Sequence, residues 1–425
     1  MRDAVIVSAA RTAVGKAPRG TLRETPPEEL AMAAVREAIA RAPGLDPAEV
    51  EDLILGCAMP EGAQGLNIAR QVALGAGIPV SASAMTINRF CASGLQALAL
   101  ATQAVQAGVH DVVVAGGMES MSFVPMIGHR FTPDPALSDT RPQVYLSMGL
   151  TAENVAERFD VSRDDQDAWG LRSHQRASAA QRAERFVDEI VPVAAHLTDV
   201  DDTGTPRVHE ATFEADEGIR HDADSTAMAN LRPVFATNGT VTAGNSSQMN
   251  DGGAALVVMT GERAAQLRLT PLGRLVSFAT AGVDPAIMGI GPVEAVPKAL
   301  TKAGIRLDDV ALVELNEAFA AQVIAVVRQL GLDEERTNVN GGAIALGHPL
   351  GASGAKLTVQ ILSELARREA GYGLVTMCVG GGQGAAGVIE WLGGRQPARA
   401  ASASEAQSKP ASESAAASVR EEAAA

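Results

Sequence analysis

The chain has 425 residues, of which 46% are hydrophobic and 20% are charged, and its formal net charge is −15. This composition is typical of a globular protein, and the acidic charge disfavours binding to nucleic acid or to an anionic membrane surface. The sequence has no run of about 18 apolar residues, so we expect no membrane span. The opening residues show no apolar signal region, and the three cysteines are odd in number and widely spaced; both features predict a cytoplasmic protein.

Short β-rich runs alternate with longer alanine-rich helical patterns along the chain. In chain order, we expect strands at 3–9, 52–57, 111–117, 311–316 and 372–381, and helices at 28–41, 93–107, 293–303, 318–330 and 353–369. Alternation of this kind predicts an α/β protein built from layered sheets.

Three segments recur in the same order in the two parts of the chain. "DLILGCAMPEGA" pairs with "ALVELNEAFAA", "CASGLQALALATQAV" with "GASGAKLTVQILSEL", and "DVVVAGGMES" with "GLVTMCVGGG". The separation is nearly constant, which predicts two copies of one βαβ-type unit.

The repeat suggests a division of the chain into four parts. We expect an N-terminal half at 1–120, completed by about 247–270, and a C-terminal half at 271–394. The more polar stretch 121–246 reads as an inserted loop domain over one face of this core, with an amphipathic helical pattern at 151–190. The segment 395–425 is dominated by Ala, Ser and Glu without hydrophobic anchors, so we predict a disordered tail.

Cys91 stands at the start of a predicted helix, in "NRFCASGLQA". The N-terminus of a helix concentrates unpaired N–H groups and positive potential, which stabilises a thiolate. The small residues after it leave room for a ligand. A lone cysteine is also a common core residue, so from this motif alone Cys91 is either a nucleophile or a buried apolar side chain.

His348 lies in "NGGAIALGHPLGASGA", at the matching strand-to-helix turn of the second copy. If the two copies pack as symmetric partners, Cys91 and His348 approach each other from equivalent helix starts, as a Cys–His nucleophile requires. A structural role for this histidine remains open. The other histidines have polar or charged neighbours in the sequence, and we expect them to be solvated: His110, His129, His174, His196, His209 and His221.

Two further positions carry functional groups at strand ends. Cys378 precedes the glycine-rich turn "VGGGQGAAG", where a thiol could exchange protons beside backbone N–H donors, or it simply ends a strand. Asn316, the first residue of "NEAFA", ends a buried strand, and its amide either holds a water or an oxyanion or caps a helix. Cys57 has no glycine-rich turn or histidine near it and reads as structural. The absence of CxxC and HxxxH pairs disfavours a metal site, and the absence of GxGxxG after a strand disfavours a nicotinamide cofactor.

Five motifs together resemble the thiolase family over about residues 1–394. They are "NRFCASGLQA", "VTAGNSSQMNDGGAA", "NEAFAAQ", "GGAIALGHPLGASGA" and "CVGGGQGAA", in the order and spacing of that family. The resemblance implies a duplicated five-layer αβαβα core with an inserted CoA-binding loop domain.

The resemblance also implies a role for each matching residue. Cys91 looks like the nucleophile that takes the acyl group as a thioester, His348 like its base, and Cys378 like the acid/base at the acetyl α-carbon or the CoA sulfur. Asn316, through a water, and His348 would hold one oxyanion. The backbone N–H groups of Cys91 and Gly380 would hold the other.

The family's CoA contacts map onto the inserted segment and its end. Ser247 and Ala243 are placed like residues that contact pantetheine, and Arg220 resembles a basic residue near the nucleotide. CoA is therefore expected as a substrate, with no tightly bound cofactor. By resemblance the protein is also expected to form a homodimer or homotetramer, with a β-oxidation multienzyme complex as a further partner.

One departure bears on the substrate. Biosynthetic thiolases that form acetoacetyl-CoA typically carry His-Met-Gly before "TAENVA", whereas this chain has Ser147 in place of that histidine. Met148, Met288 and Phe319 are either core residues or the lining of an acyl channel, and methionine adapts to variable chains. The leading hypothesis is a 3-ketoacyl-CoA thiolase of fatty-acid β-oxidation.

Four other functions compete with this hypothesis. The nearest is an acetyl-CoA acetyltransferase that forms acetoacetyl-CoA. A decarboxylating ketoacyl synthase usually needs two histidines, and Cys378 occupies the place of one. A noncatalytic acyl-CoA-binding or lipid-transfer protein is expected to lose one of the reactive residues, all of which are present. A Cys–His hydrolase would leave Cys378 without a role.

Overall fold

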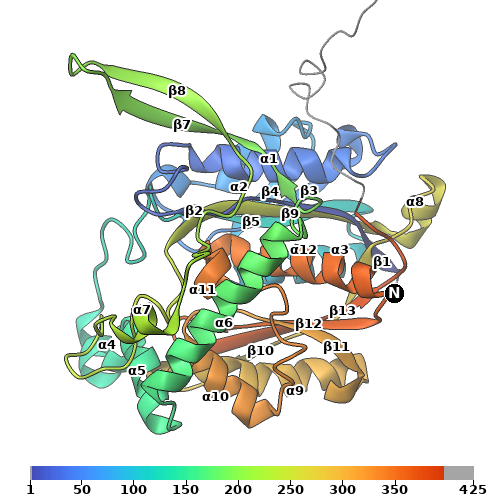
Figure 1. Ribbon diagram of the computed structural model, residues 1–425. Coiled ribbons are helices and arrows are strands. Elements are labelled where there is room, and N and C mark those ends of the chain that lie inside the picture. Colours follow the sequence, from blue (N-terminus) through green and yellow to red (C-terminus); the bar gives the residue numbers. More distant parts are fainter. Residues whose placement is uncertain (1, 397–425) are drawn as a thin grey trace, which may run out of the picture.

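The structure, a computed structural model, describes residues 2–396 and stacks helices and strands in five layers (Figure 1). Separate apolar clusters fill the spaces between the layers. This confirms the expected five-layer α/β core. The helices of the three helical layers are α1 (Pro27–Ala40) and α2 (Ile68–Gly75) on one outer face, α3 (Ser93–Ala107) and α12 (Leu350–Arg368) in the centre, and α9 (Gly291–Ala303) and α10 (Ala320–Leu330) on the other outer face.

The strands follow one another in the order β11-β12-β13-β10-β1-β9-β5-β3-β4. One antiparallel register pair, Ile6 with Gly273, joins β1 to β10 at the middle of this order. The bounds are β1 (Ala4–Thr12), β3 (Asp52–Gly56), β4 (Ser83–Ile87), β5 (Val112–Ser120), β9 (Asn250–Thr260), β10 (Gly273–Gly282), β11 (Val310–Leu315), β12 (Tyr372–Val379) and β13 (Gln383–Trp391); the short β2 (Gly15–Lys16) pairs with β9, and β6 (Ile190–Val191) with β1.

The predicted duplication is visible in the strand pairing on either side of that junction. The order β1-β9-β5-β3 on one side matches β10-β13-β12-β11 on the other. In each set the first two pairings are antiparallel and the last is parallel. The two halves therefore share one topology, and each contributes one helix, α3 or α12, to the central layer (Figure 1).

The repeated "ASG" triplet explains how the central helices meet. A Cβ atom on Gly94 would lie 2.6 Å from the backbone N of Ala355, and one on Gly354 would overlap the backbone N of Leu95. Neither glycine has room for a side chain, because the backbones of α3 and α12 touch there. This close approach brings the N-terminal ends of both helices to the same place.

The segment 121–246 carries its own elements, and the expected helical pattern at 151–190 forms two helices. The break follows from Asp160, whose φ is 51°, and from Ser162, whose side chain caps the second helix by accepting from the Asp165 N–H. The elements are α4 (Pro135–Thr140), α5 (Met148–Arg158), α6 (Arg163–Arg182), β7 (Val193–Val200), β8 (Pro206–Phe213) and α7 (Ser225–Ala229); elsewhere α8 (Gly261–Gln266) follows β9, and α11 (Ala343–Leu346) precedes α12.

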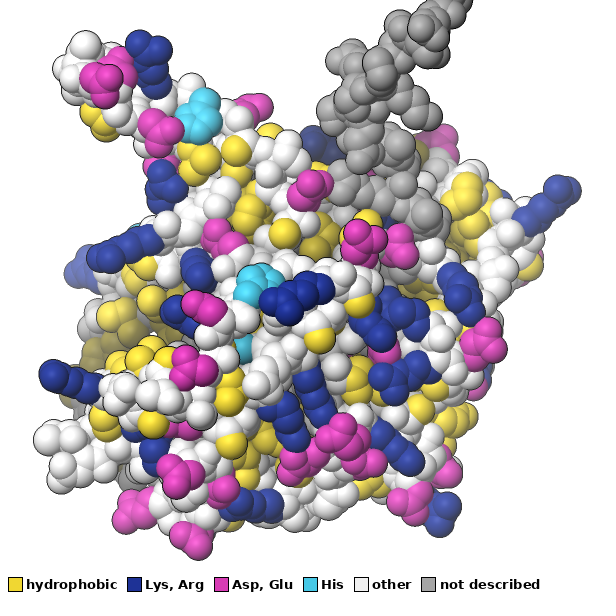
Figure 2. Space-filling view, viewed as in Figure 1, with side chains coloured by type: hydrophobic (Ala, Val, Ile, Leu, Met, Phe, Trp, Pro, Cys, Tyr) yellow, Lys and Arg dark blue, Asp and Glu magenta, His cyan; other side chains and the backbone are white. Residues whose placement is uncertain are grey.

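The strands β7 and β8 form a hairpin that projects from the body of the molecule (Figure 1). Acidic and basic side chains are intermixed over the face shown in Figure 2. In the part of the chain that the structure describes, no helix has the length and apolar character needed to cross a membrane. The predicted disordered tail, 395–425, lies outside the described residues from 397 onward.

Candidate active site

Cys91 lies in a short 3₁₀ helix, Phe90–Ala92, that leads into α3. The backbone of Phe90 has a φ of 43°, a conformation that costs energy for a side chain of this size. Ser93 holds the turn, since its hydroxyl donates to the Phe90 carbonyl at 2.7 Å and accepts from the Arg89 N–H at 2.8 Å. The turn thus fixes the position of the Cys91 sulfur at the start of a long helix.

Burial raises the pKa of the Cys91 thiol to about 12, and the backbone N–H groups of Gly380 and of Cys91 itself act in the opposite direction. At neutral pH the side chain is therefore a thiol and needs a base to become a nucleophile. The two N–H groups that face the sulfur come from the two halves of the chain. Donors in that position suit an oxyanion on an acyl group bound to the sulfur.

His348 precedes α12, and three hydrogen bonds determine its orientation. Its backbone N–H donates to Asn250 Oδ1 at 2.8 Å, its Nδ1 lies 2.5 Å from Ser353 Oγ, and its Nε2 lies 3.3 Å from Asn316 Nδ2. The preceding Gly347 has a φ of 89°, which favours glycine. The residue is only 4% exposed, so the position of its ring is set by these contacts and by packing.

Burial, together with the positive charge of Lys356, lowers the pKa of His348 to about 3. The imidazole is therefore neutral at physiological pH, with one nitrogen free to accept a proton. Cys91 packs against Leu350, two residues after His348, in one apolar cluster. The structure thus brings the predicted nucleophile and the predicted base to the same region, as the symmetric packing of the halves required.

Cys378 lies near the end of β12, opposite Gly384 of β13, and is fully buried. Burial raises the pKa of its thiol well above the ordinary value, and the charge of Cys91 raises it further. The turn that follows uses positive φ angles at Gly381 and Gly382, which favour glycine. Cys378 is therefore a protonated thiol close to Cys91, suited to give a proton.

The three predicted acyl-lining residues gather beside Cys378. Met148, Met288 and Phe319 pack with it in one apolar cluster. A Cβ on Gly380 would lie 3.5 Å from the Met148 sulfur, so this cluster continues to the turn that faces Cys91.

Ser147, the predicted point of departure from the family pattern, has a local structural function. Its side chain is exposed and accepts from the Leu150 N–H, which caps α5. The following residue, Met148, is thereby placed in the first turn of α5.

The predicted CoA contacts lie in different surroundings; they are Ser247, Ala243 and Arg220. Ser247 donates its backbone N–H to the Ala318 carbonyl at 2.9 Å, next to Phe319. Ala243 and Arg220 are exposed. Ser247 thus adjoins the apolar cluster, whereas Arg220 and Ala243 face solvent.

The prediction that His174 is solvated was wrong. His174 is buried on the inward face of α6, and its Nδ1 accepts the backbone N–H of Arg220 at 3.2 Å. The sequence neighbours are polar because they lie on other faces of the same helix. Burial, together with the charges of Arg220, Lys16 and His221, lowers the pKa of His174 to about 4. Arg220 and Lys16 therefore lie close enough to His174 to act on it electrostatically.

Sequence reasoning missed three buried partners of the reactive residues, Ser353, Asn250 and Glu119. Ser353 and Asn250 contact His348 directly, and both stand within or beside motifs that were recognised for other reasons. Glu119 accepts the Gly351 N–H at 2.8 Å and the Ala58 N–H at 2.8 Å. No local pattern points to the contacts of Asn250 and Glu119, because each one joins segments from different parts of the chain, whereas Ser353 lies five residues after His348 in the same motif.

Glu119 has a structural function at the start of α12. This helix has no side-chain cap of its own, so the carboxylate of Glu119, on β5 of the other half, binds its second N–H group. Glu119 also accepts from Gln64 Nε2 at 2.8 Å and from the Met59 N–H at 3.2 Å. It therefore ties the first half to the helix that follows His348.

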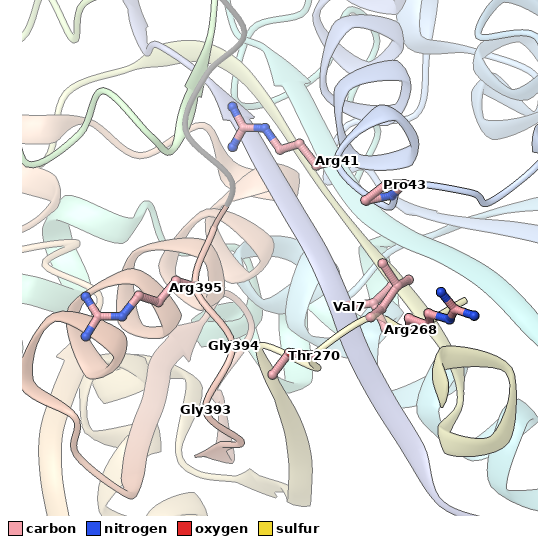
Figure 3. Close-up of a pocket in the computed structure, with 9 residues that line it drawn as sticks. Val7, Arg41, Pro43, Arg268, Thr270, Gly393, Gly394 and Arg395 are labelled. Carbon is pink, nitrogen blue, oxygen red and sulfur yellow. The ribbon is translucent and has the colours of Figure 1, made fainter. Parts of the chain in front are cut away.

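Other concave regions do not coincide with the reactive residues. A surface pocket of about 410 Å³ is lined by Arg41, Arg268 and Arg395, but their guanidinium groups point away from one another (Figure 3). A smaller one, about 230 Å³, lies between α6 and α10. Among the described residues, no three His, Cys, Asp or Glu side chains are grouped so that they could hold a metal ion.

Comparison with known proteins identifies the family. The model for the thiolase N-terminal domain matches residues 4–262, and the model for the thiolase C-terminal domain matches residues 269–391. The chain belongs to the thiolase family. It is 52% identical over 390 residues to a 3-ketoacyl-CoA thiolase of Bacillus subtilis, which covers 92% of this chain and 100% of that protein.

Proteins named acetyl-CoA acetyltransferase are also similar to this chain. An acetyl-CoA acetyltransferase of Pseudomonas aeruginosa is 46% identical over 398 residues, covering 91% of this chain and 98% of that protein. The crystal structure of the Bacillus anthracis acetyl-CoA acetyltransferase superposes with a TM-score of 0.83 at 42% identity, covering 92% of this chain and 99% of that chain. The expected fold and family are therefore confirmed.

Proposed function

We propose that this protein is a CoA-dependent acyltransferase, a 3-ketoacyl-CoA thiolase that cleaves 3-ketoacyl-CoA to acetyl-CoA and a shortened acyl-CoA. The observation that carries the proposal is the grouping around Cys91. Its buried thiol is faced by the Gly380 N–H, Cys378 lies close enough for the two charges to interact, and His348 precedes the helix that packs on it. The 52% identity to a protein named 3-ketoacyl-CoA thiolase supports the degradative direction.

In the first half-reaction, His348 takes the thiol proton as the Cys91 sulfur attacks the 3-keto carbon. The N–H groups of Cys91 and Gly380 are placed to hold the resulting oxyanion. The bond between C2 and C3 then breaks, and its electron pair forms the enolate of acetyl-CoA. Cys378 protonates C2, which leaves a thioester on Cys91 and a thiolate on Cys378.

The oxygen of the enolate needs donors of its own. Once protonated, His348 presents an Nε2–H group, and Asn316 Nδ2 lies 3.3 Å from that nitrogen. Both groups then donate to the same region, which stabilises negative charge only when the enolate forms.

In the second half-reaction, the CoA thiol gives its proton to the Cys378 thiolate and its sulfur attacks the thioester. Cys91 leaves and recovers its proton from His348, so every group returns to its starting state. The chemistry uses protein side chains and CoA as a substrate, without a tightly bound cofactor. We assign the nucleotide end of CoA to the positive charge of Arg220 and Lys16, and pantetheine to the region of Ser247 and Ala243.

Oligomer formation is part of the proposal. The edge strand β4 has an open side, and apolar side chains are exposed on or near it: Leu66 at 93%, Val80 at 81% and Met85 at 40%. Exposed edges and apolar residues of this kind favour pairing with another chain. We expect a homodimer or homotetramer in the cytoplasm, with a β-oxidation multienzyme complex as a further partner.

A second candidate, acetyl-CoA acetyltransferase, is favoured by the relatives that carry that name at 46% identity. The two are distinguished by thiolysis of 3-ketoacyl-CoA substrates of increasing length, from acetoacetyl-CoA to the sixteen-carbon substrate, with Cys91→Ser in parallel. Acetyl-CoA release that increases beyond acetoacetyl-CoA and disappears in the variant supports the degradative enzyme. Activity confined to acetoacetyl-CoA favours the second candidate, and release of free acid without CoA contradicts both.

A further inference from the structure

Ser353 lies in the first turn of α12 and its hydroxyl contacts two groups at once. Its Oγ is 2.5 Å from His348 Nδ1, and it donates to the Pro349 carbonyl at 3.0 Å. The side chain is buried, so neither contact is shared with bulk solvent. A serine hydroxyl has a single proton but two lone pairs. When that proton goes to Pro349, the oxygen must accept from the imidazole.

The other ring nitrogen independently requires the same proton arrangement. Asn316 reaches His348 Nε2 through its amide nitrogen, at 3.3 Å, and this nitrogen can only donate. Nε2 must then present its lone pair. A neutral imidazole has one N–H, which is therefore on Nδ1 and donates to Ser353 Oγ. The chain of donors runs from Asn316 through His348 and Ser353 to the carbonyl of Pro349.

We propose that Ser353 is a positioning residue that holds His348 in the Nδ1–H tautomer, so that the Nε2 lone pair, which Asn316 contacts in the free enzyme, can accept the Cys91 proton. The inference deepens the proposed function and rests on it for the role of Cys91. It assigns the third member of a Cys–His–Ser relay, in which a neutral hydroxyl orients the base.

A carboxylate is the usual orienting group beside a catalytic histidine, but the carboxylate that binds the start of α12, Glu119, is already occupied. The oxygens of Glu119 accept the N–H groups of Ala58, Met59 and Gly351 and the amide of Gln64. Glu119 therefore supports the start of α12, and orientation of the ring falls to Ser353. Because the hydroxyl carries no charge, it fixes the tautomer without stabilising a protonated imidazole in the free enzyme.

The test compares Ser353→Ala with Ser363→Ala. Ser363 is buried in the same helix and donates to the carbonyl of Val359, four residues earlier, at 3.0 Å. Ser353 makes the same kind of backbone bond to Pro349, so the two variants lose the same helix contact and differ only in the bond to the imidazole. We expect Ser353→Ala to lower kcat by roughly 10- to 100-fold with little change in KM, a part of the contribution of general acid–base catalysis. Ser363→Ala should leave both constants near wild type, and Ser353→Thr should restore kcat.

The proton position is measured directly by nitrogen NMR of histidine-labelled protein, with the His348 signals assigned by their loss in His348→Asn. The wild type should show Nδ1–H, and Ser353→Ala should show a mixture with Nε2–H. An Nε2–H tautomer in the wild type overturns the proposal, as does a kcat for Ser353→Ala within about twofold of Ser363→Ala. If the wild type shows Nδ1–H but has no thiolysis activity, the proposed function fails while the relay stands.

Discussion

Asn316 Nδ2 lies 3.3 Å from His348 Nε2, although one residue follows β11 and the other precedes α12. The amide is a donor placed beside the nitrogen that the proposed mechanism protonates. Before the reaction the Asn316 amide is a hydrogen-bond donor and His348 Nε2 is an acceptor. After His348 takes the proton, both groups are donors. This change matches the appearance of negative charge on the enolate oxygen.

Replacing Asn316 by Ala should lower kcat for thiolysis on the order of 10²-fold, as removal of one oxyanion donor does in other enzymes. Asn340→Ala is the matched control, because this buried amide binds Glu364 instead of His348. Steady-state kinetics with one 3-ketoacyl-CoA measure the effect. Equal kcat values for the two variants would remove Asn316 from the mechanism.

The pH dependence follows from the lowered pKa of His348, which is about 3. Because the folded-state pKa lies below the ordinary value, acidification from pH 8 to pH 5 leaves the base neutral. The raised pKa values of Cys91 and Cys378 likewise keep both thiols protonated in this range. We expect kcat/KM to show no acidic limb with a midpoint near 6.5, the ordinary histidine value. If kcat/KM of the wild type falls with a midpoint near 6.5 while the enzyme remains folded, the assignment of a lowered pKa to His348 is contradicted.

Removing the Cys378 thiol should separate the two half-reactions. In Cys378→Ala, the Cys91 sulfur can still be acylated by an acyl-CoA, but no thiol remains to move the proton at the α-carbon. Mass spectrometry should detect the acyl group on the Cys91 peptide, while kcat for thiolysis falls on the order of 10²- to 10⁴-fold. Cys57→Ala is the control, since the buried Cys57 thiol contacts Glu119 and packs in a different apolar cluster from Cys91 and Cys378. Full activity in Cys378→Ala would exclude its acid/base role.

Arg220→Ala tests the assignment of the CoA nucleotide. Loss of this exposed charge should raise KM for CoA several-fold at low salt without changing kcat, because the nucleotide lies far from the reacting atoms. The difference from wild type should shrink as salt rises towards about 1 M, where the Debye length is about 3 Å. Arg306→Ala, at another exposed arginine, is the control. A salt-independent change in kcat would point to a structural effect instead.

Gly354→Ala should destabilise the fold, because the new methyl group overlaps the backbone of α3 at Leu95. Overpacking of this kind costs about 1–3 kcal/mol, and a rigid backbone neighbour favours the upper end. Gly371→Ala is the control, since a Cβ there meets no atom within 4 Å. Chemical denaturation measures both free energies of unfolding. Similar values for the two variants would show that α3 and α12 can separate without cost.

Much of the fold could be predicted from local patterns. The helix at 93–107 was placed with its observed bounds, and the others with errors of up to three residues at an end. These predictions succeeded because buried strands and long apolar-periodic helices have strong local signals. The paired "ASG" triplets also indicated the duplication, since Gly94 and Gly354 occupy equivalent positions where only glycine fits.

His174 shows where local patterns fail. Its neighbours along the chain are polar, yet it is buried because it lies on the inward face of α6. Burial at such a position depends on what the helix packs against, which the helix sequence does not contain. Similarly, the break at Asp160 was missed because the amphipathic pattern continues through it.

The sequence by itself determined the family, the duplicated α/β architecture and the residues that carry the chemistry, since reactive side chains and glycine-rich turns are local and type-specific. Only the tertiary structure decided how these residues act on one another. The burial that keeps Cys91 a thiol and His348 neutral, and the contact of His348 with Asn316, depend on segments that are separate in the sequence and that folding brings together. Desolvation and hydrogen-bond geometry are properties of that assembly, so no single stretch of the chain encodes them.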